Sequence, residues 1–309
     1  MHHYTSAVGP SMPDCEADLA LQMWQQRIPQ LAFNLEVVLN PMLAWAALHL
    51  HAHSGHDPAM ARILRRYLDR ALQHHRQALL SGETELSEPT WLSAVMLTNI
   101  NWLLARYNDS NCHDVYEPPV QIWKILRGIA ILFLQRKEVL NGMGYGWYGQ
   151  KTKPRTIPRA QLSTAAKTQL RFVEEDLRFL FIAFGVEHMA DDDVSVYAEA
   201  RDYIIEQYHA FYSGTSARVL RWLIGTMVSR CQPGFCHKIE KHDPLAMALL
   251  ARTLVLMHAV EPAWWMNGVG EYKVLERDIP GLEKLMPDEL RWTMRWPCSI
   301  LDGSMKLSP

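Results

Sequence analysis

The sequence predicts an all-α protein, and three observations support this prediction. Apolar residues recur at three- and four-residue steps along most of the 309 residues, which is the period of a helix with one buried face. No segment alternates apolar and polar residues over the length of a strand with turns at hairpin spacing. No strand–helix–strand succession appears either. We therefore expect helices joined by short links, packed as a multi-helix bundle.

Capping residues, prolines and glycines mark where the helices begin and end. Asp57-Pro58 and Asp243-Pro244 each supply a cap followed by a first-turn proline, and Gly82 follows the end of one apolar pattern. On these signals we expect helices over residues 14–24, 29–55, 58–82, 87–107, 118–134, 160–188, 193–212, 216–230 and 245–260, then short helices around Trp264, Tyr272, Leu282 and Leu290.

The chain shows no internal repeat and no linker that would force a domain boundary. We therefore predict one helical domain over residues 1–309. The one long irregular stretch, residues 141–158, contains four glycines together with Tyr145 and Trp147. Such a stretch inside a compact domain is usually functional, and we expect a mobile flap with aromatic tips.

Composition limits the partners and the compartment. The net charge is -2, from 31 basic and 33 acidic residues, and no basic stripe is visible, so we expect no direct binding of nucleic acid. Apolar runs such as 129–134 are too short to span a bilayer, and no signal peptide is present. The five cysteines are odd in number and widely spaced, which favours a reducing compartment. We expect a cytoplasmic or nuclear protein.

No motif establishes a catalytic or metal site. His49 and His53 have the i, i+4 spacing that lets two imidazoles share a metal, but they also suit the polar C-terminal end of a helix. Residues 191–193 are three aspartates, which resemble a metal-binding cluster and equally suit the first turn of a helix. Cys231 and Cys236 lack a second pair of ligands. We expect neither a metal nor a cofactor.

Eleven tryptophans and fifteen methionines are the unusual feature of the composition. They either fill a large helical core or form the wall of a cavity for a flat apolar ligand. Leu254, Met257 and His258 are expected to share one helix face, with His258 as the polar group at the edge of the pocket. The candidate ligand-binding residues are Phe133, Trp222, Met227, Leu254, Met257, His258, Trp264, Trp265 and Trp292.

Four stretches in order carry a resemblance to a known family. They are His2-His-Tyr-Thr with Trp24 and Ile28-Pro-Gln-Leu-Ala-Phe33; Pro41 to Leu50 with Tyr67, Ala71 and Leu72; Pro118 to Ile131 with Trp123 and Leu126-Arg-Gly128; and Asp243 through His258 to Trp264-Trp265, Gly268-Val-Gly270, Trp292 and Trp296-Pro297. This succession resembles the C-terminal regulatory domain of fungal Zn2Cys6 transcription factors of the sterol-uptake-regulator type.

The resemblance implies an α-helical bundle that binds a sterol- or terpenoid-like molecule and a weak tendency to form homodimers. The family's DNA-binding zinc cluster, six cysteines in a short basic stretch, is missing from this sequence, so either an excised regulatory domain or a free-standing relative is expected. The alternative to a regulatory binding function is a cofactor-independent cyclase or pericyclase of fungal secondary metabolism, for example of the Diels–Alder type. Such an enzyme would act through orientation and a hydrogen bond, with His258, Tyr145 and Trp147 as its catalytic candidates. An interaction protein without a ligand is the third reading.

Overall fold

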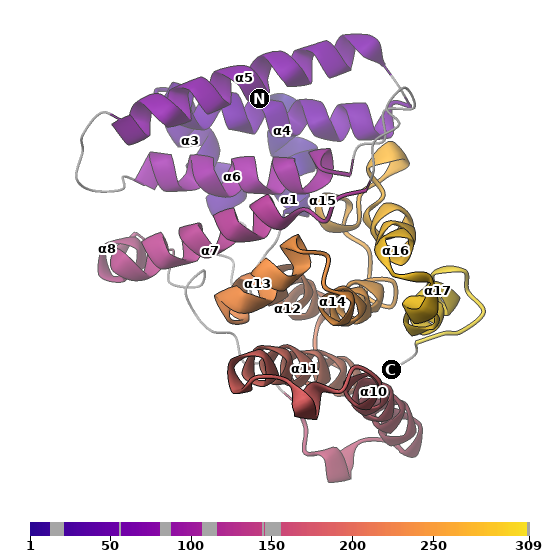
Figure 1. Cartoon of the computed structure of the whole chain (residues 1–309). Coiled ribbons are helices and arrows are strands. Elements are labelled where there is room, and N and C mark those ends of the chain that lie inside the picture. Colours follow the sequence, from indigo (N-terminus) through magenta and orange to yellow (C-terminus); the bar gives the residue numbers. More distant parts are fainter. Residues whose placement is uncertain are drawn as a thin grey trace. The chain divides into compact units, whose positions relative to one another are not determined.

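The computed structural model describes residues 1–12, 22–55, 57–80, 88–106, 116–143, 145 and 156–307. Every regular element within these ranges is a helix (Figure 1). The all-α prediction is therefore confirmed for the part of the chain that the structure describes. None of the helices in these ranges is both long and apolar enough to cross a membrane.

The chain packs as two compact units, each assembled from segments that are distant in sequence. Unit 1 comprises Met1–Asp109, Ile125–Lys151 and Ala263–Lys273, whereas unit 2 comprises Ser110–Lys124, Thr152–Pro262 and Val274–Pro309. No single cut in the chain separates the two units. One domain over residues 1–309 stays a prediction.

Unit 1 is built around helix α4, against which the neighbouring elements α3, α5, α6, η1 and η5 pack. The side chains of α4 are buried along most of its length because it has neighbours on several sides. The elements of this unit are η1 (Tyr4–Val8), α1 (Gly9–Ser11), η2 (Met23–Arg27), α3 (Ile28–Ala32), α4 (Glu36–His53), α5 (Pro58–Leu80), α6 (Glu88–Leu104), α7 (Val120–Gln135) from Ile125 onward, α8 (Lys137–Gly142), α15 (Trp264–Asn267) and η5 (Gly270–Tyr272).

The helix predicted over residues 29–55 is wrong as a single element. It divides into α3 and α4, because Leu35 adopts an extended backbone with φ -130° and ψ 106° directly before α4. The break lets α3 fold back and pack against α4, although the apolar spacing continues across it. The start predicted at Asp57-Pro58 is confirmed, since the Asp57 carboxylate accepts the backbone N–H of Ala59 at 2.9 Å.

Unit 2 is built around helix α14, whose side chains are all buried from Leu245 to Leu256. The elements that pack against it are α11, α12, α13, α16, α17 and η6. The elements of this unit are η3 (Arg159–Gln161), α10 (Thr164–Ala183), η4 (Val186–His188), α11 (Asp191–Tyr212), α12 (Ala217–Arg230), α13 (Pro233–Glu240), α14 (Pro244–Leu256), α16 (Val274–Leu285), η6 (Asp288–Met294) and α17 (Arg295–Leu301), and the first turn of α7.

Two helix ends in unit 2 differ from the sequence prediction. The segment predicted as one helix over 160–188 is interrupted at Gly185, whose φ of 60° is left-handed and ends α10. The cap at Asp243 is confirmed, since its carboxylate accepts the N–H of Ala246 at 2.9 Å. Helix α14 nevertheless ends at Leu256, so His258 lies in the following turn.

Candidate functional site

In unit 1 a partly buried ionic network joins the exposed Arg27 to the buried Glu88 and Tyr145. Glu88, in the first turn of α6, receives two hydrogen bonds from Arg27 at 2.9 and 2.6 Å and a third, short one from the hydroxyl of Tyr145. Burial alone would raise the pKa of Glu88, but these hydrogen bonds outweigh it and lower the pKa below its usual value. Tyr145 is thereby anchored at the end of the segment that follows α8.

Tryptophans form the core beside this network. Trp91 lies 5.0 Å from the ring of Tyr145 and 5.8 Å from that of Phe133. Trp24 and Trp45 meet edge to face at 5.6 Å. The first group joins α6, α7 and Tyr145, which lies three residues after α8, and the second joins η2 and α4.

Three polar side chains in unit 1 are fully buried and have no hydrogen-bond partner among the described residues. They are the hydroxyl of Tyr4, the indole N–H of Trp45 and the hydroxyl of Ser93, and all three residues have 0% of their surface exposed. Tyr4 and Ser93 lie on η1 and α6, which both pack against α4, the helix of Trp45. An unpaired buried hydroxyl or N–H costs about 1–3 kcal/mol, so three of them in one unit need an explanation.

A histidine cluster joins the N-terminus of the chain to α4. Nε2 of His3 and Nδ1 of His49 are 3.0 Å apart, and the rings of His49 and His53 stack at 4.2 Å. Burial, with the nearby His53 and His3, lowers the pKa of His49 to about 4. Within the described ranges, no group of three or more His, Cys, Asp or Glu side chains is arranged to hold a metal ion.

The segment Ala263–Lys273, which we call the clasp, packs on the same part of unit 1. The indole of Trp264 lies edge-on to His49 at 4.6 Å and donates to the hydroxyl of Ser11 at 2.7 Å. Trp102 of α6 donates to the carbonyl of Met266 at 2.9 Å. Nδ1 of His51 lies 2.8 Å from the hydroxyl of Tyr272. The clasp therefore completes a unit whose other elements come from the first half of the chain.

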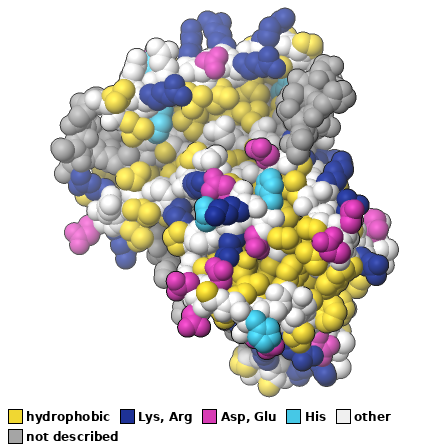
Figure 2. Space-filling model, in the orientation of Figure 1, with side chains coloured by type: hydrophobic (Ala, Val, Ile, Leu, Met, Phe, Trp, Pro, Cys, Tyr) yellow, Lys and Arg dark blue, Asp and Glu magenta, His cyan; other side chains and the backbone are white. Residues whose placement is uncertain are grey.

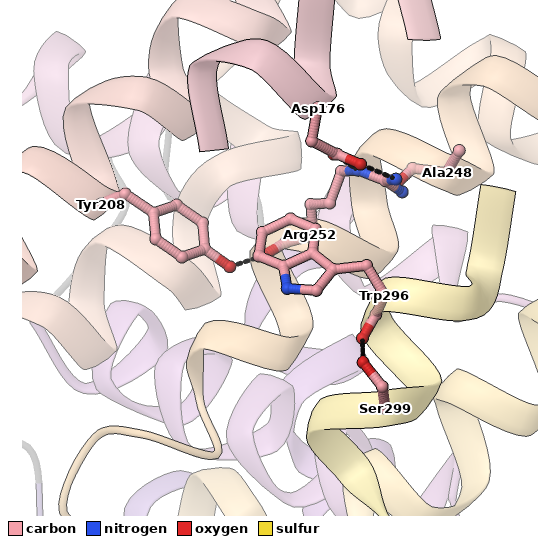
Figure 3. Close-up of polar contacts among 6 residues, drawn as sticks. All are labelled: Asp176, Tyr208, Ala248, Arg252, Trp296 and Ser299. Carbon is pink, nitrogen blue, oxygen red and sulfur yellow. Dashed lines mark hydrogen bonds and ion pairs between the residues drawn. The ribbon is translucent and has the colours of Figure 1, made fainter. Parts of the chain in front are cut away.

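Unit 2 has its own buried ionic group (Figure 3). Arg252 on α14 is 1% exposed and donates to both carboxylate oxygens of Asp176 at 2.5 and 3.0 Å. The hydroxyl of Tyr208 donates to the carbonyl of Arg252 at 2.8 Å. The ring of Trp296 lies 5.5 Å from the guanidinium carbon. Arg252 is thus fully paired, and this arrangement holds α10, α11, α14 and α17 together.

The structure distributes the predicted ligand-binding residues over both units. Phe133 lies buried in the core of unit 1, and Trp264 and Trp265 belong to the clasp. Tyr145, a candidate of the enzyme reading, lies in unit 1 as well, while Trp147 lies outside the described residues.

The remaining six candidates belong to unit 2. Sδ of Met227 accepts a hydrogen bond from the hydroxyl of Thr253 at 2.9 Å, so Met227 faces α14. Leu254 and Met257 are buried, whereas His258 is exposed. The expectation that these last three share one helix face is wrong, because the helix ends before Met257.

The other two tryptophans of this group lie nearer the surface of unit 2. Arg230 lies over the ring of Trp222 at 3.8 Å, and Phe179 meets Trp292 edge-on at 5.3 Å. Both tryptophans are half-buried, so each presents part of its ring to solvent.

The sequence analysis missed the three unpaired polar residues of unit 1. Tyr4 and Trp45 lie within the stretches that carry the family resemblance, but nothing in the local sequence distinguishes them or Ser93 from ordinary helix residues. Their significance arises from complete burial without a partner, which is a property of the packed structure. The only local signal is a polar residue, Ser93, in the middle of the apolar helix α6.

Comparisons with known proteins show similarity to fungal transcription factors. Residues 1–147 match the fungal specific transcription factor domain. A Zn(2)-C6 fungal-type transcription factor of Gibberella zeae is 22% identical over 324 residues, covering 98% of this chain and 62% of the relative. The Zn(2)-C6 fungal-type transcription factor afumD of Aspergillus fumigatus is 26% identical over 97 residues, covering 31% of this chain and 26% of the relative. No solved structure matches the chain.

These curated relatives are longer than the part of them that aligns, and the chain spans less than two thirds of the length of each. The family match ends at residue 147, shortly after the buried Tyr145, and it includes the three unpaired polar residues. Residues 1–147 are therefore similar to the fungal specific transcription factor domain, and most of the chain is similar to part of a Zn(2)-C6 fungal-type transcription factor.

Proposed function

We propose that unit 1 binds an apolar small molecule, of sterol or terpenoid type, that carries one or two polar groups. The observation that carries the proposal is the set of three fully buried, unpaired polar side chains, Tyr4, Trp45 and Ser93, in an aromatic core. A ligand hydroxyl could pair with such groups, while the tryptophan rings contact its apolar body.

Access to these groups requires a local opening of unit 1, since all three are shielded from solvent. Tyr4 lies on η1, an element of only five residues, and η1 is held to α4 by the contact between His3 and His49. Such a short element opens at a lower free energy than a long central helix. We therefore infer that the ligand enters by displacing η1 from α4.

The proposed role is regulatory. The relatives that align with the chain are named as Zn(2)-C6 fungal-type transcription factors, and one of them aligns over 98% of the chain. We infer that a ligand bound in unit 1 controls the activity of a transcription factor. We also infer that this chain has access to the nucleus and a weak tendency to form homodimers. The sterol-responsive type and the ligand itself are parts of this proposal, and direct binding of DNA by this chain is not.

The cyclase alternative has less support from the geometry. The hydroxyl of Tyr145 already donates to the buried carboxylate of Glu88, and burial together with Glu88 raises its pKa well above the usual value. His258 is exposed on unit 2. The Tyr145 hydroxyl is thus already paired and His258 belongs to the other unit, so we do not assign them a reaction.

The test combines ligand binding with stability. Ergosterol and a linear terpenoid alcohol are titrated into the full chain, and binding is followed by equilibrium dialysis. We expect Tyr4→Phe and Ser93→Ala each to weaken binding about tenfold, as expected for one lost hydrogen bond. Both variants should keep or raise the thermal midpoint, because each removes an unsatisfied buried group.

The matched control is Tyr208→Phe in unit 2. The Tyr208 hydroxyl is paired with the carbonyl of Arg252, so this variant should lose stability and leave ligand binding unchanged. Saturable binding that is weakened by Trp222→Phe or Trp292→Phe instead would place the ligand in unit 2. The absence of saturable binding for both ligands would refute the proposal.

A further inference from the structure

The outer face of α10 carries large apolar side chains although the inner face of this helix is already buried. Phe172, Phe179 and Ile182 are 40%, 57% and 62% exposed. Steps of seven and three residues place them on one side of the helix. The inner face is formed by the buried residues Leu170, Val173, Leu177 and Leu180. The outer apolar stripe is therefore not needed to pack α10 and is typical of a surface that binds a partner.

Two tryptophans pack against this stripe, the half-buried Trp292 and the buried Trp296. Trp292 of η6 meets Phe179 edge-on at 5.3 Å, and Trp296 of α17 meets Phe172 edge-on at 5.6 Å. In Figure 2, hydrophobic side chains form a broad area on the part of unit 2 where α10 and α17 lie. Because the tryptophans hold the phenylalanine rings, the surface is preorganised for binding. We call Phe172, Phe179, Ile182 and Trp292 the α10 face.

Arginines stand beside the α10 face without ion pairs. Arg178 precedes Phe179, and it is the only charged residue between Asp176 and Glu187. Arg295 follows Trp292 by three residues, about one turn of 3-10 helix. Neither arginine forms an ion pair with any residue that the structure describes.

The other charges near the face are largely neutralised. Arg171 pairs with Glu175 at 2.8 Å, and Arg291 pairs with Asp288 at 2.9 Å. Glu289, three residues before Trp292, is an acidic residue on this side with no ion pair among the described residues. Two unpaired arginines against one unpaired glutamate leave an excess of positive charge, in a chain whose net charge is -2.

We propose that the α10 face is a docking surface for an amphipathic helix of another protein, whose apolar stripe is flanked by acidic side chains. The aromatic and aliphatic side chains would receive the apolar anchors, and Arg178 and Arg295 would pair with the acidic flank. A second copy of this chain fits less well, since two copies of the face would bring unpaired arginines together.

The experiment uses the full chain and three synthetic peptides. One is an amphipathic helical peptide with leucines at i, i+3, i+4 and i+7 and glutamates on the polar face. The second has lysine in place of each glutamate, and the third has the composition of the first in scrambled order. We expect the glutamate peptide to bind measurably in isothermal titration calorimetry, and the other two to bind at least about tenfold more weakly.

Two variants of the face test the assignment. Phe179→Ser combined with Ile182→Ser should weaken binding of the glutamate peptide at least about tenfold. Arg178→Glu combined with Arg295→Glu should reverse the preference, so that the lysine peptide binds better. The matched control is Phe33→Ser, which removes an exposed phenylalanine, 76% accessible, from unit 1 and should leave peptide binding unchanged.

Several outcomes would overturn the proposal. Equal binding of the glutamate and lysine peptides, or loss of binding in the Phe33 variant, would show that the interaction is not specific to this face. A dimer in light scattering that Phe179→Ser dissociates would assign the face to a second copy. Binding to vesicles of zwitterionic lipid without binding to the peptides would assign it to a membrane surface.

Discussion

Among single residues, the buried Arg252 shows how strongly the free energy of unfolding depends on the pairing of a buried charge. Arg252 is almost completely buried, and its charge is tolerated because Asp176 accepts two hydrogen bonds and the carbonyl of Ala248 accepts a third at 2.9 Å. Removing one partner would leave a buried charge without compensation, which is far more costly than losing a surface pair.

Asp176→Asn should therefore destabilise unit 2 by about 3 kcal/mol, as expected when one partner of a buried ion pair is removed. Urea unfolding followed by circular dichroism measures the change. Glu175→Gln, one residue earlier on α10, is the matched control. It breaks only the exposed pair with Arg171 and should cost less than about 1 kcal/mol. Equal effects of the two substitutions would contradict the assigned role of Asp176.

His49 makes the stability of unit 1 depend on pH. Burial and the neighbouring His53 and His3 lower its folded-state pKa to about 4, whereas an unfolded histidine titrates near 6.5. As the pH falls below about 6.5, His49 becomes protonated in the unfolded chain but stays neutral in the folded protein. The free energy of unfolding therefore decreases toward acid pH.

We expect His49→Gln to make the thermal midpoint less dependent on pH between about pH 7 and pH 5. Differential scanning calorimetry across this range is the measurement. The exposed His258 provides the control substitution, His258→Gln, which should retain the pH dependence of the parent protein. A parallel pH profile for the His49 variant and the parent would show that this ring does not carry the effect.

At the scale of elements, the clasp depends on a backbone conformation that only glycine adopts without strain. Gly268 has φ 73°, and a Cβ atom at this position would lie 1.9 Å from the carbonyl oxygen of Tyr272. The turn therefore brings the backbone of Gly268 so close to that of Tyr272 that no side chain fits at position 268. This close approach aims Tyr272 at His51 on α4.

Gly268→Ala should destabilise unit 1 by more than about 2 kcal/mol, because the added Cβ overlaps backbone as well as imposing a strained φ. Gly214→Ala is a closely matched control. Gly214 has the same φ of 73°, but nothing lies within 4 Å of its Cβ position. The difference in unfolding free energy between the two variants isolates the overlap, and a difference near zero would show that the clasp rearranges freely.

At the scale of the whole molecule, the interleaving of the two units makes each dependent on distant segments. The family match stops at residue 147, but the indole of Trp102 donates to Met266 and Trp264 donates to Ser11. A chain that ended before the clasp would leave the Trp102 N–H without its partner and expose apolar surface on α4 and α6.

We expect a fragment of residues 1–151 to be less helical and more prone to aggregation than the same fragment with residues 263–273 fused through a flexible linker. Circular dichroism and light scattering at equal concentration provide the comparison. A fused segment that carries Gly268→Ala should fail to rescue the fragment. If residues 1–151 alone fold to the same stability as the fused form, the clasp is dispensable for unit 1.

Local signals in the sequence predict the positions of most of the helices. Asp57-Pro58 and Asp243-Pro244 begin α5 and α14 as predicted, and residues 191–193 form the acidic first turn of α11. Each of these features depends on a side chain and the backbone within one helical turn of it, so a short window of sequence contains the whole interaction. The break between α3 and α4 at Leu35 was not predicted, because the apolar spacing continues across it.

Which residues meet depends on the packing of the helices and cannot be obtained from local patterns. Residue type alone suggests Phe133, Tyr145 and Trp264 as candidates, which stay predictions, but it does not suggest Tyr4, Trp45 or Ser93, since being unpaired is a property of packing. His3 reaches His49 across 46 positions, Asp176 reaches Arg252 across 76, and Trp102 reaches Met266 across 164. Helical periodicity specifies that a face is buried without specifying its partner. The partner depends on how whole helices pack, and that depends on long-range contacts that no local pattern contains.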